Sequence, residues 1–401
     1  MTVDVEDIQK FQGGGSWMKG AGAIGVLGLI GALVGVFTGG KEGAYSYLVG
    51  FTYWGGVAIA GLLWVMIFHA FHAKWMVVLR RPFEAIASTL PLFALLVIPL
   101  LIATKAGNLY SWVHPEDNGF KGEALELLHH KAGYLSVGFF IARTVIYFAL
   151  LIFLSQRLWS WSTRQDATGD IQLTASSRRL SAGGLPFLAL TIAFAAFDWL
   201  MSLSPLWFST MFGVYFFAGA FLTCMSLVSV VNSLATGKDN YAQLVSAEHS
   251  HNVGKLMFAF TCFWAYIGFS QFMLIWIANL PEETPFFTLR MQEPWRPVSI
   301  VLIITHFFVP FLTLLSRKLK RNPRHLRIID FWLLTVNFLD LYWLVMPTLS
   351  PERVIFLVWL IAAWVGIGGV GIAFALWRLR GNYAVPVRDP FLSVSLRYRQ
   401  P

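Results

Sequence analysis

The sequence has 401 residues, of which 57% are apolar, 16% are aromatic and only 13% are charged, and its mean hydropathy is +0.63. A soluble domain carries roughly 25% charged residues, so this composition excludes an ordinary soluble enzyme and indicates a polytopic membrane protein. The formal net charge of +9 does not point to nucleic acid. The basic residues fall in short segments between apolar runs, where they act as a topology signal.

Ten apolar runs are long enough to cross a bilayer, which takes about 20 residues. In chain order the predicted spans are Gly20–Thr38, Tyr45–Phe71, Glu84–Ala103, Ala132–Ser155, Gly184–Leu203, Ser209–Leu234, Leu256–Asn279, Pro297–Leu315, Ile328–Met346 and Arg353–Trp377. The predicted fold class is therefore an all-α polytopic membrane protein. The longest intervening segments, Thr104–Lys131 and Gln156–Gly183, have room for a loop and a short helix each, which excludes a catalytic domain outside the membrane.

Lysine and arginine are distributed unequally between the two sides of these spans. The termini and the segments after the second, fourth, sixth and eighth spans hold 22 of the 30, and the segments after the odd-numbered spans hold 7, counting Arg353 at the outer boundary of the last span. The remaining one, Arg143, lies within a span. Since positive charge is retained on the cytoplasmic side, both termini are predicted to be cytoplasmic.

A spacing match suggests an internal repeat. Asp198 in the fifth span precedes Pro205 by seven residues, and Asp340 in the ninth span precedes Pro347 by seven residues, with each proline at the outer end of its helix. Both spans run in the same direction, so we predict two parallel four-helix bundles with two peripheral helices, an arrangement common among membrane folds. The predicted divisions are a cytoplasmic N-terminal segment 1–19, a peripheral first helix 20–43, a first bundle 44–208, a second bundle 209–350, a peripheral tenth helix 351–380 and a cytoplasmic tail 381–401.

Glycines are concentrated in the first and last spans. The first span carries Gly22, Gly25, Gly28, Gly31 and Gly35, and small residues at such spacings allow close helix approach in lipid. This face is predicted to pack against another helix or subunit. The last span contains a formal GxGxxG over residues 366–371, but it lacks the strand that precedes a nucleotide-binding loop, so no nucleotide site is expected.

Ionisable residues within spans mark candidate functional sites, since a charge there costs at least ~2.5 kcal/mol. Asp198 lies at a depth similar to that of Arg143 in the fourth span, with Tyr147 one turn further inward. Asp340 lies at a depth similar to that of His306 in the eighth span. We therefore predict two pairs, Asp198 with Arg143 and Asp340 with His306.

Three interpretations of these pairs remain open: structural ion bridges that fix helix register, proton transfer, and a ligand site. A proton route also needs polar steps toward each surface, although serine in a span more often bonds a backbone carbonyl. The candidates for the whole route are Asp198, Arg143, Tyr147, Asp340, His306, Ser202 on the outer side, and Ser226, His249 and His251 on the inner side. His129 and His130 are weaker candidates for contact with a quinol head group.

The chain itself is expected to hold no redox cofactor or metal. Its two cysteines, Cys224 and Cys262, lie within apolar runs, and the sequence has no CxxC or CxxCH. These spacings exclude the recognisable iron–sulfur, c-type haem and structural zinc motifs. The start of the chain, 1–12, is polar and acidic and lacks a basic segment, so no cleaved signal peptide is expected.

Four segments together resemble a known family: LYSWVHP at 109–115, LLHHKAGY at 127–134, FFIAR at 139–143 and DWLMSLSPLWFSTMFGVY at 198–215. They are similar to the NrfD/PsrC-like membrane subunits of bacterial alternative complex III, a quinol:cytochrome c (or other acceptor) oxidoreductase. The likeness spans most of the ten runs and is greater to the ActF type than to the larger ActC type. It implies two four-helix bundles with two flanking helices in the bacterial inner membrane.

The resemblance also implies partners and a role. The expected partners are an ActC-like membrane subunit, an iron–sulfur subunit, cytochrome c subunits and, beyond the complex, a terminal oxidase. The haem c and iron–sulfur clusters would belong to those partners, and quinol oxidation mainly to ActC, which leaves proton translocation and scaffolding for this chain. Asp198 and Arg143 match the family motifs. Leu206 stands where many relatives carry His, which puts a His-dependent quinol site at that position in doubt.

Two other functions remain open from the sequence. In the first, the chain is the quinol-binding subunit itself. In the second, from a different class, it is a stand-alone ion-coupled secondary transporter, which ten spans and intramembrane carboxylates also allow.

Overall fold

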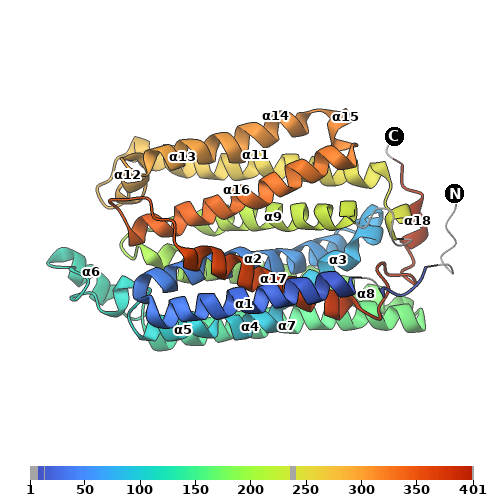
Figure 1. Cartoon of the computed structure of the whole chain (residues 1–401), viewed down its shortest axis with the longest axis horizontal. Coiled ribbons are helices and arrows are strands. Elements are labelled where there is room, and N and C mark those ends of the chain that lie inside the picture. Colours follow the sequence, from blue (N-terminus) through green and yellow to red (C-terminus); the bar gives the residue numbers. More distant parts are fainter. Residues whose placement is uncertain (1–7, 13, 235–240, 400–401) are drawn as a thin grey trace.

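The computed structural model describes residues 8–12, 14–234 and 241–399, so the extreme ends of the predicted N-terminal segment and tail lie outside the described residues. Ten helices in this described part are long and apolar enough to cross a membrane. They lie side by side along the long axis of the molecule (Figure 1). The predicted all-α, ten-span fold is confirmed.

Long helices account for the ten spans. In chain order they are α1 (Gly15–Thr38), α2 (Gly40–Ala70), the broken span α3 (Val77–Ala87), α4 (Leu90–Leu96) and α5 (Ile98–Lys105), α7 (Val137–Thr168), α8 (Ile171–Trp199), α9 (Phe212–Leu234), α11 (Ala247–Ala278), the span formed by α13 (Arg296–Ile303) and α14 (Val309–Leu315), α16 (Pro323–Leu349) and α17 (Val358–Leu379). A π-helical segment, η5 (Ile304–Phe308), joins α13 to α14.

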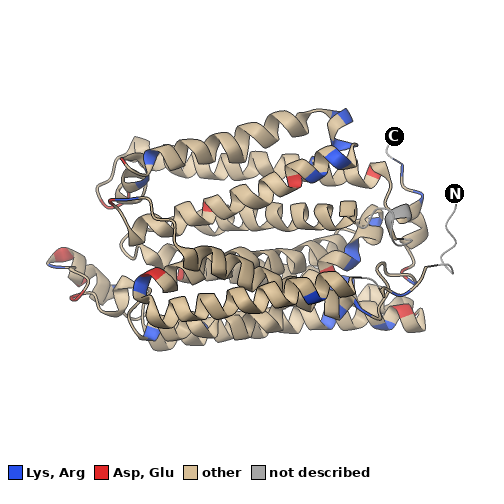
Figure 2. Cartoon of the chain, in the orientation of Figure 1, with Lys and Arg blue, Asp and Glu red and all other residues tan. Residues whose placement is uncertain are grey.

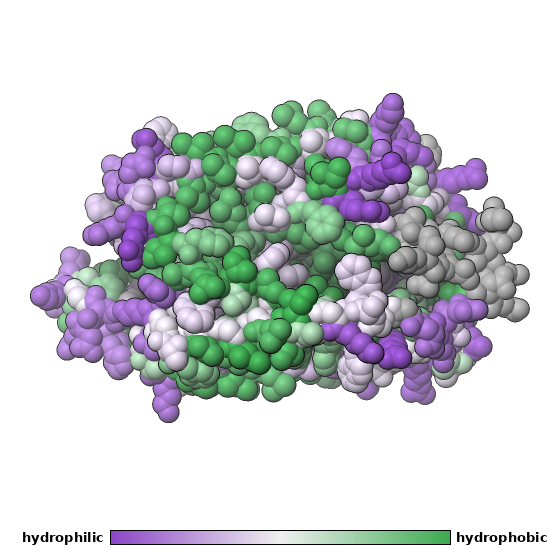
Figure 3. All heavy atoms as spheres, viewed as in Figure 1, coloured by the Kyte–Doolittle hydropathy of each residue, from purple (hydrophilic) through white to green (hydrophobic). Residues whose placement is uncertain are grey.

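Short helices lie between or beyond the spans. They are α6 (Glu123–Lys131), α10 (Tyr241–Leu244), α12 (Pro285–Met291), α15 (Arg317–Lys320) and α18 (Leu392–Leu396). Both termini lie at one end of the molecule, which we call the terminal end, and α6 protrudes from the other, which we call the α6 end (Figure 1). Charged residues are concentrated at these two ends (Figure 2), and apolar side chains gather between them on the face shown in Figure 3.

Several helices extend further than predicted. The segment 156–183 is not a loop: α7 continues to Thr168, Gly169 takes a left-handed conformation, and Asp170 caps the start of α8 through the amide of Gln172. Likewise α11 begins nine residues before the predicted Leu256. These turns are polar, and hydropathy detects only the part of a helix that lies in the hydrocarbon core.

Close glycine contacts join α1 to α17. A Cβ added to Gly28 would lie 2.8 Å from the backbone of Gly366, and one added to Gly25 would lie 2.4 Å from the backbone nitrogen of Val370. Side chains would therefore force the two helices apart. The predicted small-residue contact is thus made with another helix of the same chain, and the formal GxGxxG is part of it.

The most buried helix is α2, which packs against α1, α3, α8, α9, α16 and α17. On one side of it, α3–α5, α7 and α8 contact one another; on the other side, α9, α11, α13–α14 and α16 do so. We call these groups the first bundle, in which α2 is counted, and the second bundle; because α2 packs against both, the predicted repeat of two parallel four-helix bundles stays a prediction. The pair α1 and α17 packs against α2 from outside both groups (Figure 1).

Candidate functional site

Asp198 is fully buried in the last turn of α8 and forms a bidentate ion pair with Arg143 of α7. Arg143 Nε donates to Oδ2 at 2.8 Å and Nη2 donates to Oδ1 at 2.9 Å. The Tyr147 hydroxyl donates to Oδ2 at 2.6 Å. Arg143 and Tyr147 are four residues apart and therefore share one face of α7. The predicted pairing of Asp198 with Arg143 is observed, and Tyr147 completes the cluster.

Two aromatic rings cover the Arg143 guanidinium of this cluster. The Arg143 guanidinium lies 3.8 Å from the ring centroid of Tyr134 and 4.5 Å from that of Phe139, and Arg143 Nη1 donates to the Tyr134 carbonyl at 2.9 Å. Tyr134 is 37% exposed. Burial and the nearby Asp198 carboxylate raise the pKa of Tyr134, so its hydroxyl stays protonated at neutral pH. Sequence analysis did not identify Tyr134 as a site residue, although it ends the LLHHKAGY segment.

The hydroxyl of Ser202 donates to the backbone carbonyl of Asp198 at 2.5 Å, not to its carboxylate. It therefore satisfies a carbonyl at the end of α8, and its predicted place in a proton route is not supported. Two further donors satisfy backbone groups nearby: the Tyr110 hydroxyl bonds the Trp199 carbonyl at 3.0 Å, and Lys131 Nζ bonds the Pro205 carbonyl at 2.9 Å.

The carboxylate of Asp340 is held by two neutral donors. The Tyr215 hydroxyl of α9 donates to Oδ1 at 2.5 Å, and the Trp264 indole of α11 donates to Oδ2 at 3.1 Å. His306 instead places Nε2 3.0 Å from Oδ1 of Asn337. The predicted Asp340–His306 pair is therefore wrong. Similar depth did not fix where each side chain points around its helix.

A buried arginine near the α6 end lies close to the proline of the second bundle. Pro347 lies inside α16 and has no N–H for the carbonyl of Trp343, four residues earlier. Arg290 of α12 supplies the missing donor: Nε bonds the Trp343 carbonyl at 3.2 Å and Nη2 bonds the Leu344 carbonyl at 2.7 Å. In the first bundle, by contrast, α8 ends before Pro205.

Two buried polar groups toward the terminal end were not predicted from the sequence. Asp330 in α16 is fully buried, and neither carboxylate oxygen has a hydrogen bond of regular geometry, although Ser229 interacts with the carboxyl group. It lies ten residues from Asp340, or about 15 Å along the helix. The second group is an ion-pair network on α3, α7 and the tail that contains Arg80, Arg81, Glu84, Ser162, Asp166 and Asp389.

This network was missed because the sequence placed Arg80 and Arg81 in a loop and began the third span at Glu84. In the structure Arg81 pairs with Asp166 and Glu84, and Arg80 bonds Asp389 of the tail at 2.8 Å. Arginines that were included in the count used to predict membrane orientation can thus be buried, provided that enough acidic side chains surround them. The network attaches the tail to the bundle.

The inner-side candidates have structural partners. Ser226 donates to the Leu222 carbonyl at 2.9 Å, within its own helix. His249 and His251 lie in the first two turns of α11, not in a loop as predicted, and both are buried. His249 takes part in the helix cap with Ser246 and places Nε2 3.1 Å from the Ser395 carbonyl of the tail. These contacts give no support to a proton relay.

The two weaker candidates, His129 and His130, are exposed on the protruding α6. Neither forms a hydrogen bond or ion pair with Asp198 or Asp340, whose partners are Arg143, Tyr147, Tyr215 and Trp264. Within the described residues, no three or more His, Cys, Asp or Glu side chains form a group that could hold a metal ion. Neither protein-family models nor curated proteins match the sequence.

Proposed function

We propose that the chain is a membrane subunit of a quinol-oxidising respiratory complex of the alternative complex III type, and that its Asp198 cluster belongs to a proton-translocation path. In this proposal the terminal end faces the bacterial cytoplasm, and the chain acts as a scaffold beside an ActC-like subunit. Haem c and iron–sulfur clusters in partner subunits carry the electrons. Quinol is oxidised in the neighbouring subunit.

The observation that carries the proton path is the full burial of Asp198 against Arg143 and Tyr147. A buried ion pair contributes little net stability, because desolvation offsets the Coulomb attraction. Ionisable groups inside membrane spans therefore usually have a functional role, such as carrying a proton along a route. Tyr134 supports the path, because it contacts Arg143 and is partly exposed, which connects the buried pair to the surface.

The path is tested with Asp198→Asn in the complex isolated from native membranes. The variant keeps the size and shape of the side chain but cannot exchange a proton. We expect assembly to persist while proton release per electron, or quinol turnover, falls. Asp117→Asn, at an exposed position, is the matched control and should behave as wild type. Unchanged stoichiometry and rate in Asp198→Asn would leave only a structural role for the ion pair.

Membership of a respiratory complex is supported by the four resembling segments. Mild purification from native membranes tests it. The proposal expects co-purification with a haem c protein and an iron–sulfur protein, identified by absorbance and electron paramagnetic resonance. Isolation of the chain alone would favour the ion-coupled transporter instead. A quinone-site photolabel attached to this chain, and not to its neighbour, would make it the quinol-binding subunit.

A further inference from the structure

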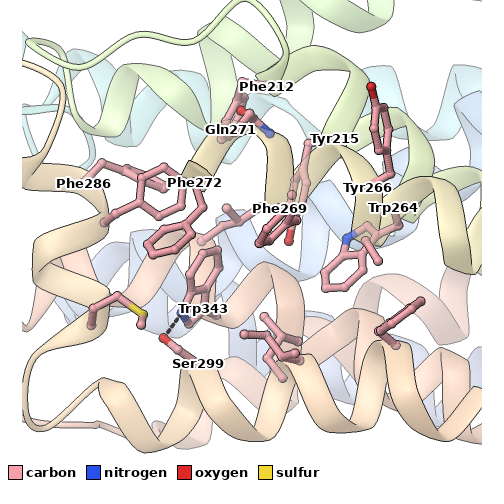
Figure 4. Close-up of a pocket in the computed structure, with 18 of the residues that line it drawn as sticks. Phe212, Tyr215, Trp264, Tyr266, Phe269, Gln271, Phe272, Phe286, Ser299 and Trp343 are labelled. Atoms are coloured by element: carbon pink, nitrogen blue, oxygen red, sulfur yellow. Dashed lines mark hydrogen bonds between the residues drawn. The ribbon is translucent and has the colours of Figure 1, made fainter. Parts of the chain in front are cut away.

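A cavity of about 510 Å³ lies in the second bundle, between α11 and the α13–η5 span and beneath α12. Aromatic side chains dominate its wall, and several of them point into it from different helices (Figure 4). Among them are Tyr215, Trp264, Phe269, Phe272, Phe286 and Trp343. The volume is in the range of ligand pockets, which are commonly ~300–1,000 Å³.

The cavity opens sideways toward the bilayer. Tyr266 and Phe269 of α11 line it and are 66% and 63% exposed, and Ile303 and Phe308 on the facing span are also exposed. These helices belong to candidate membrane spans, so the exposed side chains face lipid. No charged residue lines the cavity. Its occupant is therefore neutral within the cavity and enters from the membrane.

The shape of the cavity fits one long chain in one leaflet. The lining residues Cys262 and Phe272 are ten residues apart on α11, which corresponds to about 15 Å at 1.5 Å per residue. The hydrocarbon core of a bilayer is about 30 Å thick. The cavity thus extends from the middle of α11 toward the α6 end over about half the membrane, the depth that one acyl chain occupies.

A stacked pair of aromatic rings lines the α6 end of the cavity. Trp207 is a buried lining residue, and its ring is stacked on Phe286 of α12 with centroids 3.9 Å apart. Two polar side chains of the wall already have partners: Gln271 accepts from Ser209, and Ser299 donates to the Arg290 carbonyl. The wall is therefore suited to an apolar chain.

We propose that this cavity is a binding site for one acyl chain of a membrane phospholipid. The acyl chain runs from Trp207 toward Cys262, and the head group remains at the α6-end surface. The chain contacts Tyr215 and Trp264, the two residues whose polar atoms hold Asp340. The bound lipid therefore supports the second buried carboxylate. This inference does not depend on the proposed respiratory role.

The test measures lipid retained by the purified protein, with its co-purifying subunits, after exhaustive detergent exchange. Native mass spectrometry and lipid extraction identify what remains. Ala265 lines the cavity, so Ala265→Phe fills it; Ala259 is exposed on the same helix outside the cavity, so Ala259→Phe is the matched control. We expect one tightly held phospholipid in wild type and in Ala259→Phe, and loss of most of it in Ala265→Phe.

A second variant protects the test against misfolding of the first. Ile303 lines the cavity from the facing span, so Ile303→Trp narrows it from the other side, and we expect this variant to retain less phospholipid than wild type. Three outcomes would overturn the proposal: equal phospholipid in wild type and Ala265→Phe, equal loss in both alanine variants, or a quinone as the retained molecule. Full retention in a folded Ile303→Trp would also overturn it.

Discussion

The two bundles each bury an aspartate seven residues before a proline, yet they stabilise it in different ways. In the first bundle Asp198 receives a bidentate guanidinium from Arg143 together with the Tyr147 hydroxyl. In the second, Asp340 receives only neutral donors, from Tyr215 and Trp264. The first site is thus a charge pair, whereas the second is a carboxyl group with hydrogen bonds and no counter-charge.

The buried arginine of the second bundle has a different function. Arg290 donates to backbone carbonyls at the proline of α16 and forms no ion pair. The same sequence spacing therefore supports two chemistries, because the partners come from other helices. Of the two sites, only the first contains a buried pair of opposite charges. Removing a partner of Asp198 should therefore lower the stability of the protein more than removing a partner of Asp340.

The largest effect is expected from Arg143→Leu. This change leaves the Asp198 carboxylate buried without its counter-charge, and breaking such a pair typically costs about 3–5 kcal/mol. The thermal midpoint of the isolated protein in detergent should fall sharply. The double variant Arg143→Leu/Asp198→Asn should recover much of that loss, since no lone charge remains. Equal midpoints for the single and double variants would show that the pair is not the source of the loss.

Arg290→Leu should have the next largest effect. It leaves the carbonyls of Trp343 and Leu344 without their side-chain donor in a buried setting, which costs about 1–3 kcal/mol. Hydrogen exchange near Pro347 should accelerate, while exchange around Asp198 should stay at the wild-type rate. Faster exchange spread evenly over both bundles would contradict this local role of Arg290.

A smaller effect is expected from Trp264→Phe. The variant removes one neutral donor to Asp340 and keeps most of the ring, and a single hydrogen bond contributes about 0.5–1.5 kcal/mol. Tyr215→Phe, which removes the other donor, should cost a similar amount. The two variants can be compared by denaturant unfolding. A cost from either as large as that of Arg143→Leu would mean that the Asp340 site also depends on buried charge.

Ser202→Ala should change least. Its hydroxyl bonds the backbone carbonyl of Asp198 at the end of α8, so turnover and proton release should match wild type, with a stability loss of about 1 kcal/mol or less. Ser226→Ala, in the middle of α9, is the companion variant for the inner side. A strong fall in proton release in either one would restore that serine to the route.

The sequence predicted the spans and the Asp198–Arg143 pair because both depend on simple physical signals. Apolar length determines a span, and a lone acid within it needs a cation at its own depth. It did not predict the partners of Asp340, because depth does not give the angle of a side chain around its helix. Asp330 was overlooked because it lies at the start of a predicted span, close to the membrane surface, where acidic side chains are usually solvated.

The most direct test compares Asp198→Asn with Asp340→Asn, the same substitution in the two counterpart sites. The native complex carrying each variant is placed in sealed vesicles, and protons released per electron are measured during quinol oxidation. We expect the ratio to fall in Asp198→Asn and to remain near wild type in Asp340→Asn. A wild-type ratio in Asp198→Asn, or an equal fall in both variants, would contradict the assignment of proton transfer to the buried ion pair.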